Sequence, residues 1–158
     1  MPLAHKLKES TQSATLIALL NQLLANTIDF KLSAKQAHWN VKGANFISLH
    51  ELFGKVSIAV DEYADMLAER AVQLGGTALG SLPTVAEQSV LPPYPVDIHE
   101  GSDHIRTLSS RIGMLADTQR QAINTSINIG DMVTADLLTE ITRGLDKLHW
   151  FIRSHLNG

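Results

Sequence analysis

The 158-residue sequence contains no cysteine. Disulfides, thiolate zinc sites and cysteine nucleophiles are therefore excluded. Charge of either sign is also scarce, since charged residues make up 18 % of the chain and the formal net charge is −3. This balance gives no broad electrostatic attraction to nucleic acid or to a membrane surface.

Long hydrophobic runs are missing as well. Residues 16–24 are largely apolar but are interrupted by Asn21 and Gln22, so no segment reaches membrane-spanning length. The start of the sequence lacks a signal-peptide pattern, and a cytoplasmic location is the expectation. The metal ligands that are present are seven histidines and sixteen carboxylates. These ligands favour iron, manganese or zinc over softer metals.

Apolar residues recur at alternating spacings of four and three, which is typical of core-facing helices. The hydrophobic content of 44 % is enough for one globular domain over residues 1–158, with a short N-terminal tail of about residues 1–10. The first helix is expected to begin at the capping hydroxyls of Ser10–Ser13 and to end near Gly43. Its predicted core stripe is Leu16, Leu20, Leu23, Thr27, Phe30, Ala34 and Ala37.

The second helix is expected over Phe46–Leu74, and the glycine- and proline-rich segment 75–97 that follows predicts a long connection with one short helix near Pro83. Ser102 is expected to cap a third helix, and Asp131 to open a fourth that stops at residues 157–158. The fold class is therefore all-α, a four-helix bundle with a crossover between its second and third helices.

One face of the second helix mixes metal-ligand side chains with apolar ones, beside the predicted core stripe. It carries His50, Gly54, Asp61, Asp65 and Glu69, together with Ile47 and Ile58. Solvated surface carboxylates are the simpler interpretation of such a stripe, but the isoleucines favour an interface with a polar site in it.

The spacing of these ligands prevents them from meeting on one helix. His50 and Glu69 lie roughly 28 Å apart along the axis. If the helix packs antiparallel against a copy of itself about a two-fold axis near residues 59 and 60, His50 becomes level with the partner's Glu69, and position 54 with the partner's Asp65. The sequence therefore predicts a metal site between two identical subunits. His38, at the end of the neighbouring helix, is a further candidate ligand, whereas Trp39 and Trp150 are expected to fill the core.

Several metal motifs are absent. The chain has no Glu-x-x-His pair of the kind that completes a di-iron site within one subunit. The stretch from His50 to Gly54 has only the first half of the His-Glu-x-x-His zinc-protease pattern.

Three stretches strongly resemble the DNA-protection-during-starvation (Dps) family of mini-ferritins. They are Lys35-Gln36-Ala37-His38-Trp39-Asn40-Val41-Lys42-Gly43-Ala44-Asn45-Phe46 followed by His50-Glu51, Asp65-Met66-Leu67-Ala68-Glu69-Arg70-Ala71, and Leu145-Asp146-Lys147-Leu148-His149-Trp150-Phe151-Ile152. The resemblance covers nearly the whole chain. It implies a ferritin-like bundle that assembles into a hollow dodecamer.

The resemblance also implies a ferroxidase centre shared across each two-fold interface. His38, Asp65 and Glu69 of one subunit would face His50 of the other, bind Fe(II) and oxidise it, with hydrogen peroxide as the preferred oxidant. The product would be stored as ferric mineral, which protects the cell from oxidative damage. Iron is the only cofactor or substrate metal that the resemblance implies.

Gly54 departs from the family pattern, which places an aspartate four residues after the second histidine. The remaining two histidines and two carboxylates can hold one iron, and a second would bind weakly. Asp61 or Glu51 could compensate for the missing carboxylate, or water could fill its place.

The resemblance places acidic residues near the start of the last helix at pores on three-fold axes. Asp131 and Asp136 match that region, although Asp131 is also the expected helix cap, which makes Asp136 the better pore candidate.

Family members that coat DNA commonly use a lysine-rich tail. The N-terminal segment here offers only Lys6 and Lys8, offset by Glu9, so DNA binding and nucleoid association are expected to be weak or absent. Two alternatives to an iron-oxidising store therefore stay open. One is a nucleoid-coating stress protein, and the other is a metal-binding cage, for zinc among other metals, whose ferroxidase activity Gly54 impairs.

Overall fold

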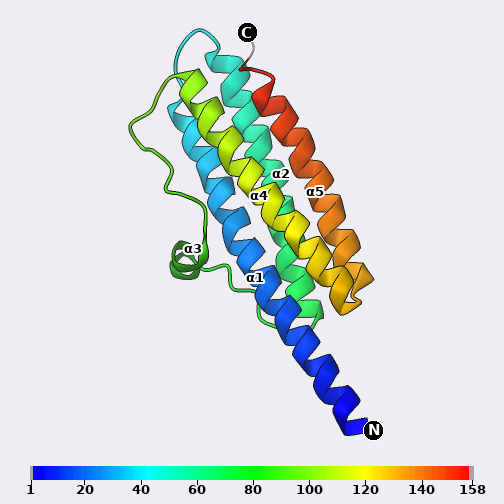
Figure 1. Ribbon diagram of the computed structural model, residues 1–158. Coiled ribbons are helices and arrows are strands. Elements are labelled where there is room, and N and C mark those ends of the chain that lie inside the picture. Colours follow the sequence, from blue (N-terminus) through cyan, green and yellow to red (C-terminus); the bar gives the residue numbers. More distant parts are fainter. Residues whose placement is uncertain (1, 157–158) are drawn as a thin grey trace.

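The computed structural model describes the backbone of residues 2–156 and the side chains of residues 9–156. It contains five helices in this part of the chain: α1 (Pro2–Asn40), α2 (Phe46–Gln73), α3 (Leu82–Gln88), α4 (Gly101–Ile129) and α5 (Met132–Arg153). Helices α1, α2, α4 and α5 form a four-helix bundle, and α3 lies beside α1 (Figure 1). The predicted all-α bundle is therefore confirmed.

Two antiparallel hairpins, α1–α2 and α4–α5, make up the bundle. The segment between α2 and α4 crosses the length of the bundle and carries α3, as expected near Pro83 (Figure 1). At its end the crossover returns to the α1–α2 turn, where the Lys42 amide donates to the His99 carbonyl oxygen over 2.9 Å. This long connection is needed because α2 and α4 run in the same direction.

The helix boundaries agree with the expected ones except at the ends of the chain. Helix α1 begins at Pro2 rather than at Ser10–Ser13, so the expected tail of residues 1–10 falls almost entirely within this helix. Proline suits the first helical position because its fixed φ is helical and its missing amide hydrogen would be unpaired there. Helix α4 begins at Gly101 with Glu100 at its N-cap position, so Ser102 lies inside the helix and does not cap it as expected. Helix α5 ends at Arg153 rather than at residues 157–158.

The core follows the predicted stripes closely. All seven predicted positions of α1, from Leu16 to Ala37, are buried. In α2, Leu49, Phe53, Val56, Val60 and Leu67 are buried, whereas Phe46 in the first turn is 39 % exposed. None of the described helices is both long and apolar enough to cross a membrane.

Two tryptophans contradict the expectation. Trp39 is 65 % exposed and Trp150 is 56 % exposed, so neither fills the core of the single chain. Each lies next to the core stripe of its helix rather than on it. Ile47 and Ile58, the isoleucines of the ligand-bearing face of α2, are both 62 % exposed. Apolar side chains this exposed are typical of surfaces that contact another protein.

Candidate metal centre

His38 and His50 form a stacked pair within one chain. His38 lies in the last turn of α1 and His50 in the second turn of α2, and the short 41–45 turn brings them face to face. Their ring centroids are 3.7 Å apart, and the ring planes are inclined by 20°. Within one chain, His38 therefore lies beside His50, whereas the expected division of ligands grouped it with Asp65 and Glu69.

Each ring of this pair is oriented by the main chain of the other residue. His38 Nδ1 lies 2.6 Å from the His50 carbonyl oxygen, and His50 Nδ1 lies 2.7 Å from the His38 carbonyl oxygen. A carbonyl oxygen can only accept, so both Nδ1 atoms carry the hydrogen, and in the neutral rings both Nε2 atoms keep a free lone pair. A histidine held in this tautomer by a carbonyl is the usual arrangement of a metal ligand.

Gly54 allows this arrangement. The residue is buried on α2, and an ideal Cβ built there would lie 3.1 Å from His38 Nδ1 and 3.2 Å from His38 Cε1. The imidazole of His38 thus rests directly on the backbone of α2. Any side chain at position 54 would push the ring away by a few tenths of an ångström.

Asp65 and Glu69 lie one turn apart on α2, and both are exposed. Neither makes a hydrogen bond or ion pair with any described residue of the chain, so both carboxylates are available to a cation. Asp65 lines a groove of about 600 Å³ between α1 and α2. His50 and Asp65 are fifteen residues apart on one helix, which corresponds to about 22 Å.

The histidine pair and the carboxylate pair therefore do not meet within a single chain. Among the described residues, no group of three or more His, Cys, Asp or Glu side chains is placed to hold a metal. The donor set itself, imidazole nitrogen with carboxylate oxygen, suits Fe(II) and other borderline divalent ions.

The two residues considered as compensating ligands lie in different surroundings. Glu51 is exposed. The Asp61 carboxylate accepts a hydrogen bond from Lys31 Nζ over 2.6 Å. Lys31 and Asp61 lie thirty residues apart on different helices, so the spacing of residues in the sequence does not predict that they pair.

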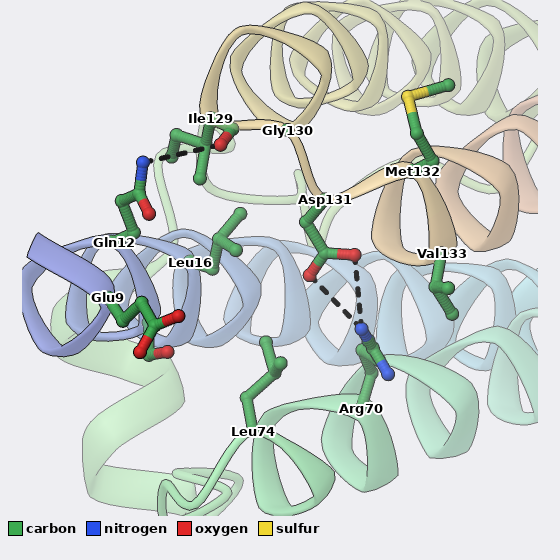
Figure 2. Close-up of a pocket in the computed structure, with 11 residues that line it drawn as sticks. Glu9, Gln12, Leu16, Arg70, Leu74, Ile129, Gly130, Asp131, Met132 and Val133 are labelled. Atoms are coloured by element: carbon green, nitrogen blue, oxygen red, sulfur yellow. Dashed lines mark hydrogen bonds and ion pairs between the residues drawn. The ribbon is translucent and has the colours of Figure 1, made fainter. Parts of the chain in front are cut away.

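Asp131 lies at the α4–α5 junction and is held by Thr134 and by Arg70; Figure 2 shows its contacts with Arg70. It caps α5 by accepting from the Thr134 amide, and both of its carboxylate oxygens accept from Arg70 Nη2, over 3.2 and 3.1 Å. Burial raises its pKa, but the Thr134 amide and hydroxyl and the Arg70 guanidinium outweigh this and hold the pKa below its usual value.

Asp136, by contrast, is exposed and has no hydrogen-bonding or ionic partner among the described residues. Of the two pore candidates, it is thus the one whose charge is free to attract a cation.

Comparisons with known proteins identify the class to which this fold and this donor set belong. Residues 17–158 match the family model of the ferritin-like domain, so the chain belongs to the ferritin-like family. Within that family it is a member of the Dps group. It is 46 % identical over 155 residues to the DNA protection during starvation protein of Agrobacterium fabrum, covering 96 % of each chain.

Solved structures of Dps proteins have the same fold as this chain. The structure of Dps from Microbacterium arborescens in the high iron form has a TM-score of 0.87 and 33 % identity, covering 93 % of this chain and 95 % of that one. A Dps protein from Vibrio cholerae O1, described as a member of the ferritin-like diiron-carboxylate proteins, has a TM-score of 0.87 and 28 % identity, covering 92 % and 91 %.

Proposed function

We propose that this protein is an iron-sequestering mini-ferritin that oxidises Fe(II), with hydrogen peroxide as oxidant, at sites shared between two subunits. The observation that carries the proposal is the reciprocal hydrogen bonding of His38 and His50, which leaves two Nε2 lone pairs available to a metal. The similarity to a Dps structure in a high iron form supports iron as the metal.

In this proposal the ligands of each site are His38 and His50 of one subunit with Asp65 and Glu69 of its two-fold partner. The antiparallel pairing of α2 about residues 59 and 60 brings the two sets to the same level. The exposed Ile47 and Ile58 on the same face supply the apolar contacts of such an interface. Twelve subunits would form the hollow cage, and its location would be cytoplasmic.

Each group has a defined part in the reaction. The two imidazoles bind the incoming ferrous ion through nitrogen. The two carboxylates add negative charge, which favours the ferric product over the ferrous substrate. Hydrogen peroxide takes one electron from each of two ferrous ions and, with two protons, is reduced to two water molecules, so two reactants that would otherwise generate radicals are consumed together. The ferric product is then stored as mineral inside the cage, and Asp136 lines the pore through which iron enters.

The proposal is tested by iron oxidation. The metal-stripped assembly is mixed anaerobically with Fe(II), peroxide or oxygen is added, and ferric absorbance is followed. We expect fast oxidation with peroxide, and a drop of at least about tenfold in a His50→Ala, Asp65→Ala variant. Rates equal to the protein-free control would contradict the proposal and would favour a cage that binds metal, such as zinc, without oxidising iron.

A further inference from the structure

The groove between α1 and α2 is lined by one positively charged side chain and by several carboxylates. It is lined by Lys31 from α1 and by Asp61, Glu62 and Asp65 from α2, over apolar walls that include Ile28. Asp65 is a ligand in the proposed function, on which the present inference depends.

Lys31 is directed specifically at Asp61. Its Nζ donates to Asp61 Oδ1 over 2.6 Å, with the two side chains 32 % and 61 % exposed. The backbone of Lys31 is also tied to α2, because its carbonyl oxygen accepts from the hydroxyl of the buried Ser57 over 3.4 Å. This hydrogen bond fixes the position on α1 from which the Lys31 side chain reaches Asp61.

Asp61, Asp65 and Glu69 follow one another at intervals of four on the same face of α2. Of these three carboxylates, only Asp61 is neutralised by a cation within the described part of the chain. The other two are unpaired. The three carboxylates are chemically similar, but Asp61 is paired with Lys31, whereas Asp65 and Glu69 have no cationic partner within the described residues.

We propose that Lys31 is a positioning residue that keeps Asp61 out of the metal centre and so limits the carboxylates of each site to Asp65 and Glu69. A carboxylate whose Oδ1 accepts from an ammonium at 2.6 Å has part of its negative charge and one of its oxygens committed to that partner, so it binds a metal ion less strongly than a free carboxylate. The ammonium also repels a divalent cation that approaches this end of the groove. Without Lys31, Asp61 is a free anion one helical turn from Asp65.

The test measures binding of Co(II), a divalent ion that oxygen does not oxidise in this setting, by calorimetry on the metal-stripped assembly. Lys31→Met should bind Co(II) about threefold to tenfold more tightly than the wild type. The double variant Lys31→Met, Asp61→Asn should return to within about twofold of the wild type, because the freed carboxylate is gone. Lys147→Met removes the same charge from an exposed position of α5, outside this groove and on a different helix from the proposed ligands, and should leave the affinity unchanged.

Three results would overturn the inference. Lys31→Met could bind no more tightly than the wild type. The double variant could bind more weakly than the wild type, which would make Asp61 a ligand already. The gain could also persist in the double variant, which would mean that Asp61 is not the group released. If instead the wild type and a His38→Ala, His50→Ala variant bind Co(II) equally, the proposed metal centre fails, and the inference about Lys31 fails with it.

Discussion

At the scale of single residues, Gly54 determines the position of His38. The sequence shows only that a carboxylate is missing at position 54. The structure adds that the space of a Cβ is already used, since the His38 ring lies within 3.2 Å of it. An aspartate at position 54 would therefore add a carboxylate but displace the ring of His38, which is itself a proposed ligand.

Substitution Gly54→Ala tests this role. The ring of His38 must move, which weakens the hydrogen bond from its Nδ1 to the His50 carbonyl, and we expect Co(II) affinity to fall by about tenfold. Thermal stability should change little, because alanine favours the helix by about 0.5–1 kcal/mol and offsets the contact. Gly113→Ala is the matched control, since a Cβ there would be at an ordinary 3.6 Å from His149 Cε1. An unchanged Co(II) affinity in Gly54→Ala would show that the ring is not constrained by this glycine.

At the scale of helices, the repeat of apolar residues was enough to predict four helices, their core faces and the crossover. A repeat gives the face of a helix but not its partner across the bundle. For this reason the contact of His38 with His50 and that of Lys31 with Asp61 were not predicted, although each residue involved was visible in the sequence. The exposure of Trp39 and Trp150 was not predicted for a similar reason. A large apolar side chain is expected in the core of its own chain, and the sequence does not show which side chains contact another subunit instead.

The repeat of apolar residues also does not predict the buried polar groups that hold the crossover segment. His104 on α4 is 1 % exposed, and its Nδ1 is 2.7 Å from the hydroxyl of Tyr94 on the crossover. The Nε2 atom of His104 is also buried. Burial, and to a smaller degree the nearby His99, lowers the pKa of His104 below its usual 6.5.

This lowered pKa predicts a loss of stability in acid. Below about pH 6.5 the unfolded chain takes up a proton at His104, while the folded chain does not. The free energy of unfolding therefore decreases as the pH is lowered from about 6.5 to the pKa of His104 in the folded chain. His104→Asn keeps an acceptor for Tyr94 but cannot titrate. Its melting temperature should therefore fall less than that of the wild type between pH 7.5 and pH 5, when both are measured at equal subunit concentration. Parallel curves of melting temperature against pH would exclude His104 as the cause.

At the scale of the whole molecule, net charge decides the interaction with DNA. The formal charge of −3 per chain is repeated in every subunit of an assembly, and such a shell repels the phosphate backbone. We expect no retention of duplex DNA in a gel shift at physiological salt and neutral pH. Tight retention under those conditions would favour the alternative of a nucleoid-coating protein.

We propose that each metal site is made of parts from two chains, because His50 and Asp65 lie about 22 Å apart on one helix and cannot bind the same ion within one chain. Neither set alone offers three ligands within the described residues. A variant without the histidines and a variant without the carboxylates should then complement each other.

The most direct measurement is iron oxidation by mixed assemblies of a His38→Ala, His50→Ala variant and an Asp65→Ala, Glu69→Ala variant, dissociated together and reassembled. Each variant alone should be inactive. In a random equal mixture half of the two-fold pairs are mixed, and each mixed pair rebuilds one of its two sites, so the activity should recover to about a quarter of the wild-type value. Mixed assemblies as inactive as either variant alone would contradict a site shared between subunits.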